Sequence, residues 1–444
     1  MSAMDNYGNG PSTGQIQSGV RRVSTMFKPE DLQMNAEDRQ VLRKLAQRVA
    51  TIADSSEMAE RKELWRRVNT LEKTRPVILC EPENGWNEII TERQMACIGK
   101  LARHWEMDLR KEIFWGEEMG DDKPVEPYFN VPCILMPDDW GVEVIEHKPD
   151  TQGGSLAWEA PIKDYETDFG RLKMPQIVVD WATSNGSFEI ARDTFGDILK
   201  VRQKTLWWSS LGITREVIKL RGLMNLYSDF YDHPDGLKAL MSFISKVNMA
   251  KLDFLEENNL LNLNNDGTYI GSGGYGFTDE LPQSDFQGNV RAVDLWGFTE
   301  SQETVNVSPE HYEEFVFPAE KPIMDRFGLT CYGCCEDLHT RWHVVKKHHN
   351  LRRVSCSPWA NIESMSANLE EKYVFSMKPS PTPLSMPRLD LDAVRHDLRQ
   401  AMVVTRDNVV EVIMKDNHTL GNRPENAVEW SRVAKEESMR VSGM

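Results

Sequence analysis

The sequence predicts an α/β protein organised as a (β/α)8 TIM barrel with an N-terminal helical extension. From about residue 175 onward, short strand-like runs alternate with amphipathic helical stretches, which is the pattern of a βα-repeat fold. Four successive strand-like runs, at residues 328–334, 352–357, 373–377 and 409–414, each end in polar residues. A (β/α)8 barrel places its active site at these carboxyl ends.

The chain divides into three predicted parts. Residues 1–25 are polar and rich in Gly, Ser and Asn, and we interpret them as a flexible N-terminal lead. Residues 26–130 are assigned to the helical extension that packs on the barrel, because apolar residues recur there at helical spacing. Residues 131–444 form the barrel itself.

Within the extension, apolar spacing predicts helices over residues 30–75 and over residues 90–115. Between them, the apolar run at residues 73–80 predicts the first strand, which ends at a polar turn over residues 81–86.

In the barrel part, further strands are predicted at residues 260–266 and 293–298. The first of these runs into the glycine-rich stretch GSGGYG at residues 271–276, which lacks the Lys-Ser/Thr of a phosphate-binding P-loop. We interpret it as a mobile active-site loop. A helix is predicted over residues 309–327, because a serine N-cap and a proline in the first turn open it.

Composition and charge disfavour several classes of function. The chain has 444 residues, of which 27% are charged, and a net charge of −17. Nucleic acid and anionic membrane are not expected as partners, because neutralising phosphates needs clustered Lys and Arg. No apolar run has the length of a membrane span or a signal-peptide core. The seven irregularly spaced cysteines do not form a disulfide framework, so we expect a cytoplasmic protein.

The most informative feature is the stretch GLTCYGCCED at residues 328–337. Cys331, Cys334 and Cys335 lie within five positions there, next to Glu336. Thiolates so close together outside a secreted protein indicate metal ligation or catalysis, although cysteine can also simply fill a core. Strand alternation does not choose between the three cysteines, because the glycine among them can redirect the chain.

The last predicted strand ends in KDNH at residues 415–418, and in a closed barrel this strand lies across the mouth from the cysteines. Soft thiolates and an imidazole suit tetrahedral zinc with one position open for substrate. We therefore predict a zinc site with Cys334, Cys335 and His418 as ligands, and with Cys331 and Glu336 as substitutes.

Other strand-end residues complete the predicted site. Asp416 and Glu336 are candidates for acid–base or orienting work, with Asp416 orienting His418 or the substrate. The predicted substrate pocket is lined by Trp359, Asp266, Glu300 and Lys415. Each of these acidic residues could instead have an ordinary structural role in a turn or beside the site. Cys356 is assigned to the core or to the surroundings of the ligands, and the four histidines of residues 339–349 to a solvated helix face.

Two segments resemble the uroporphyrinogen decarboxylase-like superfamily. Residues 300–318 (ESQETVNVSPEHYEEFVFP) are similar to its helix entry of pattern SPE..F.EF..P, and residues 226–234 (LYSDFYDHP) to its YD.P helix. With the order of the late strands, the resemblance covers residues 175–430. It implies a (β/α)8 barrel that is either a metal-free decarboxylase or a zinc-dependent methyltransferase working with a corrinoid protein.

In those methyltransferases, a His-x-Cys pair on a middle strand and a cysteine on the last strand hold zinc. By strand order, residues 331–335 fall where the pair lies and His418 falls where the last cysteine lies. This chain departs from the pattern, because its middle strand has no histidine and its last strand has histidine in place of cysteine. The arginine-containing N-terminal motif of the decarboxylases is not found, which weakens a porphyrinogen substrate.

We therefore predict a zinc-dependent methyltransferase, the demethylase component of a corrinoid-dependent system. It would move a methyl group between a small O- or N-methylated substrate, such as a methoxylated aromatic, and the corrinoid (cobalamin) of a partner protein. The alternative is a metal-independent decarboxylase or lyase of the same fold, with Lys378 and Lys415 at the mouth. A third hypothesis is a noncatalytic barrel that binds a corrinoid or a metal. The sequence is also compatible with a homodimer.

Overall fold

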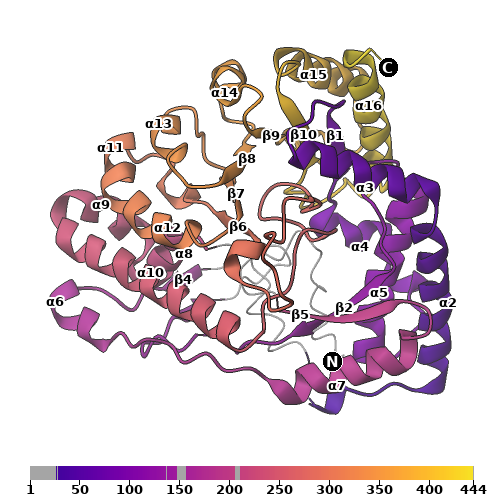
Figure 1. Ribbon diagram of the computed structural model, residues 1–444, viewed down its shortest axis with the longest axis horizontal. Coiled ribbons are helices and arrows are strands. Elements are labelled where there is room, and N and C mark those ends of the chain that lie inside the picture. Colours follow the sequence, from indigo (N-terminus) through magenta and orange to yellow (C-terminus); the bar gives the residue numbers. More distant parts are fainter. Residues whose placement is uncertain (1–26, 28, 137, 148–156, 206–210, 444) are drawn as a thin grey trace.

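The structure is a computed structural model that describes residue 27 and residues 29–443, apart from residues 137, 148–156 and 206–210 (Figure 1). The chain is an α/β protein with a parallel six-stranded sheet and helices around it. The predicted N-terminal lead lies outside the described residues.

The six-stranded sheet has the order β1-β10-β9-β8-β7-β6, and all its neighbouring strands are parallel. Its strands are β1 (Val77–Cys80), β6 (Trp296–Thr299), β7 (Leu329–Tyr332), β8 (Leu351–Cys356), β9 (Val374–Met377) and β10 (Val409–Met414). All six overlap strands predicted from the sequence. Their nearly continuous burial follows from the covering of both sheet faces, as in other parallel sheets.

Two smaller sheets accompany it. β2 (Tyr128–Cys133) pairs in parallel with β5 (Lys200–Thr205), and β3 (Ile145–His147) pairs antiparallel with β4 (Ala157–Glu159). No strand ladder among the described residues joins the β2–β5 sheet to the six-stranded sheet. The described strands therefore do not form the closed eight-stranded barrel that the sequence predicts. β1 belongs to the main sheet although it comes from the predicted extension.

Side chains replace strand pairing between β5 and β6. The predicted strand at residues 260–266 is irregular, and Asn262 accepts a hydrogen bond from the backbone N–H of Thr205 at 2.8 Å. Two residues later, Asn264 donates to the carbonyl of Trp296 at 2.9 Å and accepts from its N–H at 3.0 Å. An amide side chain carries both donor and acceptor groups, so it can satisfy the backbone of a neighbouring strand. This explains why an apolar and asparagine-rich run was mistaken for a strand.

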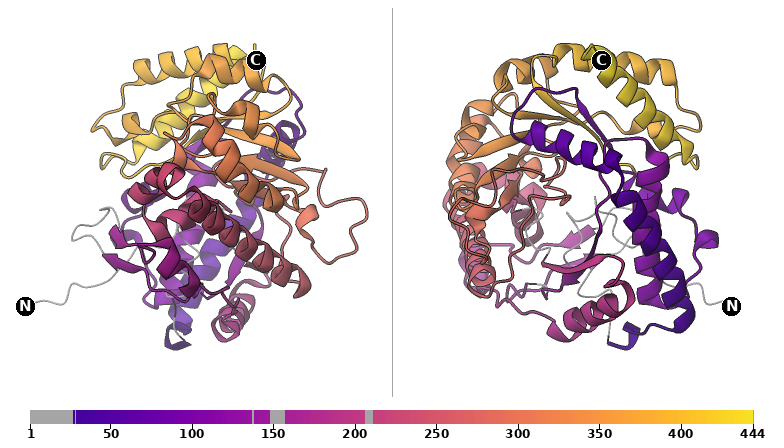
Figure 2. Two further views of the ribbon diagram at one scale, coloured as in Figure 1. Left: turned by 90° about the vertical axis from the view of Figure 1, so that its left-hand side faces the viewer. Right: turned by 45° about the vertical axis from the view of Figure 1, so that its right-hand side comes forward.

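The helices surround these sheets (Figures 1 and 2). α2, α5 and α7 pack near the β2–β5 sheet, whereas α15 and α16 pack together at the β1–β10 end of the main sheet. The helices are α2 (Ala36–Ala53), α3 (Ser56–Asn69), α4 (Trp86–Ile89), α5 (Lys100–Phe114), α6 (Tyr165–Asp168), α7 (Trp181–Phe195), α8 (Ile213–Arg221), α9 (Leu223–Asp232), α10 (Pro234–Glu257), α11 (Pro309–His311), α12 (Phe317–Met324), α13 (Trp342–Val345), α14 (Ile362–Leu369), α15 (Leu391–Val404) and α16 (Glu425–Val441).

The predicted helix over residues 309–327 is one helical stretch in which a π-helical turn joins α11 to α12. The side chain of Ser308 accepts a hydrogen bond from the N–H of His311 at 3.2 Å, which confirms the predicted N-cap. Within the described part of the chain, no helix is both long and apolar enough to cross a bilayer.

The glycine-rich stretch is buried between the elements that carry the site, so the prediction of a mobile loop is wrong. Residues 271–278 are all buried. The guanidinium of Arg353, in β8, donates to the carbonyl of Tyr275 at 2.9 Å, and the indole N–H of Trp296 donates to the carbonyl of Gly276 at 3.0 Å. A Cβ on Gly274 would lie 2.1 Å from the ring of Trp65. The glycines therefore permit close packing and do not indicate mobility.

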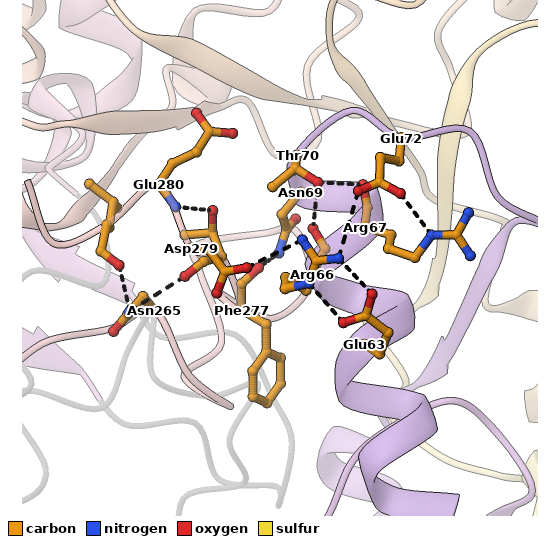
Figure 3. A network of polar contacts seen from close by, with 12 residues as sticks. Glu63, Arg66, Arg67, Asn69, Thr70, Glu72, Asn265, Phe277, Asp279 and Glu280 are labelled. Carbon is orange, nitrogen blue, oxygen red and sulfur yellow. Dashed lines mark hydrogen bonds and ion pairs between the residues drawn. The ribbon is translucent and has the colours of Figure 1, made fainter.

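The end of α3 fixes the exit of this stretch (Figure 3). The amide of Asn69 donates to the carbonyls of Tyr275 and Phe277, at 2.8 and 2.7 Å. Arg66 pairs with Asp279 at 3.3 Å. The glycine-rich stretch is thus held from β8, from β6 and from a helix that lies more than 200 residues earlier in the chain.

Candidate functional site

Polar side chains follow the strands of the main sheet at their carboxyl ends, where ligands bind in parallel α/β proteins. All of these side chains are buried. They are Glu81 after β1, Glu300 after β6, Cys334 after β7, Ser357 after β8, Lys378 after β9 and Lys415 after β10. The parallel sheet thus gathers acids, a thiol and amines along one edge.

The turn after β7 brings two thiols together. Gly333 has φ 96°, a left-handed conformation that glycine adopts without strain, and the chain turns there. Beyond the turn, the Sγ atoms of Cys334 and Cys335 lie 3.6 Å apart. Glu336 holds the turn in place, because its carboxylate accepts from the N–H of Cys334 at 2.9 Å and from the N–H of Ser301 at 3.0 Å. We call Cys334 and Cys335 the dithiol.

The two thiols differ in acidity. The hydrogen bond from Cys334 to Cys335 lowers the pKa of Cys335 and raises that of Cys334, which is the donor. Burial further raises the pKa of Cys334, whereas Cys335 is exposed. Cys335 is therefore the more acidic of the two thiols and is exposed to solvent, and the thiolate is the form that attacks electrophiles or binds metals.

Two buried amines follow β9 and β10, and one of them, Lys415, lies near the dithiol. Burial disfavours the charged form of Lys415, but Cys334 and the carboxyl groups of Asp416 and Glu83 outweigh this effect and raise its pKa. The ammonium of Lys415 donates to Asp416. By contrast, burial lowers the pKa of Lys378 to about 8, and its amine donates to the hydroxyl and carbonyl of Ser376.

Two carboxyl groups at the same edge have raised pKa values. Burial, followed by repulsion from Glu303, Glu336 and Cys334, raises the pKa of Glu300 well above its usual value. Burial likewise raises the pKa of Glu83 to about 7. A carboxyl group with a raised pKa is suited to general acid work.

The predicted zinc ligands are only partly brought together. The dithiol supplies two sulfurs, but Cys331 lies inside β7, where burial raises its pKa to about 12. His418 is exposed on the turn after β10. Considering the described residues alone, no three His, Cys, Asp or Glu side chains are arranged as a metal site.

Other predicted site residues lie in different places. Glu336, proposed as a catalytic residue, uses both oxygens to hold the backbone of the turn. Asp266 pairs with Arg202 at 2.8 Å and with Lys204 at 3.1 Å, beside β5. Trp359 is 78% exposed, so its ring lies at the surface. Glu300, Lys415 and Asp416 do lie at the strand ends near the dithiol.

Sequence reasoning missed Ser272, whose hydroxyl donates to Cys334 Sγ at 3.5 Å. The glycine-rich motif that contains it was the available signal. His348 was assigned to a solvated face, but it is 3% exposed and stacks on Tyr332, with a ring-centroid distance of 5.0 Å. Burial lowers its pKa to about 4, so it is a neutral core histidine.

A cavity of about 280 Å³ lies against the glycine-rich stretch. Tyr269 and Tyr275 line it, together with Trp115, Lys111 and Lys204. The carboxyl groups of Glu83 and Asp416 act on the hydroxyl of Tyr269, so this cavity lies near the strand-end site. It is the candidate substrate pocket, with aromatic walls and a few charged groups, as is usual for small-molecule sites.

Comparisons with known proteins identify no family for the chain. No protein-family model matches it, and no curated protein matches it in sequence. Among solved structures, it is similar to a methyltransferase from Methanosarcina mazei, with 10% sequence identity and a TM-score of 0.49. That similarity covers 85% of this chain and 98% of the methyltransferase chain.

Proposed function

We propose that the protein is a methyltransferase that moves a methyl group between a small O- or N-methylated compound and a corrinoid protein. The observation that carries this proposal is the dithiol, with its Sγ atoms 3.6 Å apart at the carboxyl edge of a parallel sheet. The ammonium of Lys415 stabilises negative charge there. On this view, the main sheet and the β2–β5 sheet are the two parts of an interrupted (β/α)8 barrel.

The spacing of the dithiol fits two ligands of one zinc ion. Two thiolates bound at about 2.3 Å in tetrahedral geometry lie about 3.8 Å apart, close to the 3.6 Å between these sulfurs. Cys334 and Cys335 would hold the ion, and His418 is the proposed third ligand, which would have to turn inward from its exposed position. Zinc in this place would supply Lewis acidity toward the oxygen or nitrogen that bears the methyl group.

The surrounding residues can manage the charges and protons of such a reaction. Lys415 lies beside the thiols and Asp416 holds its ammonium in place. Loss of a methyl group leaves an electron pair, and hence negative charge, on the oxygen of an ether substrate. Burial raises the pKa of Glu300 well above its usual value, which suits this carboxyl group to deliver a proton to the leaving oxygen.

A metal-independent decarboxylase or lyase remains the second candidate function, because Lys378 and Lys415 are both buried at adjacent strand ends. Two amines in that position can bind the carboxylate of a substrate. This alternative requires neither the dithiol nor a metal.

Metal content and methyl transfer, measured together on anaerobically purified protein, separate the two functions. We expect about one zinc ion per chain and methyl transfer from a methoxylated phenol to free cob(I)alamin, which stands in for the corrinoid protein. The double variant Cys334→Ser/Cys335→Ser should lose the zinc and at least 100-fold in rate. Cys133→Ser, at a buried cysteine of β2, is the matched control and should keep both.

Protein without zinc whose double variant keeps the full rate would overturn the proposal. The lyase alternative would instead predict that Lys378→Met abolishes turnover of a carboxylated substrate and that chelators have no effect.

A further inference from the structure

A second cavity, of about 310 Å³, lies between the main sheet and the C-terminal helices. It is bounded by the carboxyl ends of β8 and β9 and by the helices α14, α15 and α16. Phe375 and Met377 of β9 line it, and these side chains alternate along the strand with Ser376, which bonds Glu411 and Lys378. The cavity therefore lies on the face of β9 that does not carry Ser376. It is part of the layer between the sheet and the helices.

The wall of this cavity is largely apolar. Besides the two β9 residues, it is lined by Ile362, Val394, Leu398 and Trp430. The volume is about twice the roughly 150 Å³ of an engineered apolar cavity that stays dry and binds benzene. An apolar space of this size has room for a small aromatic molecule.

One polar group in the wall lacks a partner. Ser357, directly after β8, is 5% exposed, and its hydroxyl has no hydrogen bond to any described residue. Leaving a buried hydroxyl unsatisfied costs about 1–3 kcal/mol. Two other polar residues of the wall have hydrogen-bond partners. Lys378 donates to Ser376, and Ser380, at the exposed rim, donates to Thr382.

We propose that this cavity is a binding site for a neutral aromatic molecule with one hydroxyl group, which exchanges a hydrogen bond with Ser357. The apolar wall takes up the ring, and Met377 offers a sulfur contact to its edge. An anionic ligand fits less well, because the wall is largely apolar and the exposed Asp397 also lines the cavity. Neither cysteine of the dithiol lines this cavity, so the proposal does not depend on the proposed methyl transfer.

The test uses p-cresol and toluene, which have nearly the same shape and differ in the hydroxyl group. Protein labelled with ¹³C at the methionine methyl groups is titrated with each probe and followed by NMR, and the Met377 signal is assigned with Met377→Leu. We expect both probes to shift the Met377 signal. Ser357→Ala should weaken the binding of p-cresol about tenfold, because the ligand hydroxyl then lacks a partner. The same variant should weaken the binding of toluene less than twofold.

Two further variants fix the location. Ala401→Leu places a larger side chain in the wall of the cavity and should abolish the binding of both probes. Ser380→Ala changes a rim serine and should leave both affinities unchanged. The proposal is overturned if neither probe shifts Met377, or if Ser357→Ala weakens the two probes equally. Binding that survives Ala401→Leu would also overturn it.

Discussion

Ser272 donates a hydrogen bond to Cys334 across 3.5 Å, which joins the buried glycine-rich stretch to the dithiol. The serine hydroxyl is one of the groups that can stabilise a thiolate at Cys334 once a metal or a substrate removes the proton. Replacing it with alanine removes that donor at a cost of about 1 kcal/mol. We expect Ser272→Ala to slow methyl transfer about fivefold. Ser228→Ala, at an exposed helical serine, is the control, and an unchanged rate in both variants would refute the role of Ser272.

Cys335 should be the most reactive cysteine of the chain. It is exposed, and the hydrogen bond from Cys334 lowers its pKa, whereas the other six cysteines are buried. In metal-stripped protein at pH 7, we expect iodoacetamide to alkylate Cys335 at least tenfold faster than any other cysteine, because the thiolate is the reactive form. Peptide mass spectrometry gives the rate at each position. Equal rates at Cys335 and Cys356 would contradict the assignment.

The glycine-rich stretch should not tolerate a side chain at Gly274. A methyl group there would lie 2.1 Å from the ring of Trp65 and 2.8 Å from a carboxylate oxygen of Glu411. Overpacking of this kind costs about 1–3 kcal/mol. We expect Gly274→Ala to lower the free energy of unfolding by about that amount in urea titrations. Gly170→Ala, where a Cβ has no neighbour within 4 Å, should change it by less than about 0.5 kcal/mol.

Glu320 should make stability depend on pH near neutrality. Burial raises its pKa from 4.5 to about 8, even though Tyr312 and Tyr332 donate to its carboxylate. Between these two values the folded protein keeps a proton that the unfolded chain has lost, so stability falls as the pH rises. The slope is about 1.4 kcal/mol per pH unit.

Glu320→Gln cannot ionise, so it removes this contribution. We expect the free energy of unfolding of the wild-type protein to fall by about 1 kcal/mol more than that of the variant between pH 6.5 and 7.5. His348, whose lowered pKa of about 4 affects stability with the opposite sign, is present in both proteins, so the comparison between them removes its contribution. Parallel pH profiles for the two proteins would contradict the raised pKa of Glu320.

The main sheet could be predicted from sequence because its strands are short apolar runs that end in polar residues. β7, β8, β9 and β10 all fall within or next to their predicted ranges. The segment at residues 260–266 was mistaken for a strand because Asn262 and Asn264 satisfy the neighbouring backbone through their side chains, and local pattern does not reveal this.

The site was predicted less completely than the sheet. The dithiol could be found because three cysteines within five positions are unusual in a chain with seven. The contact of Ser272 with Cys334 could not, because the two residues are 62 positions apart and meet only in the folded protein. For the same reason, the inward direction of His348 is set by packing against Tyr332 and Phe317, which its basic sequence neighbours conceal.

The central claim is that Cys334 and Cys335 bind one metal ion together. X-ray absorption at the zinc edge of the purified protein measures this directly. We predict two sulfur neighbours at about 2.3 Å from zinc, with the remaining neighbours nitrogen or oxygen. A spectrum without sulfur neighbours, or one unchanged in Cys334→Ser/Cys335→Ser, would contradict the account.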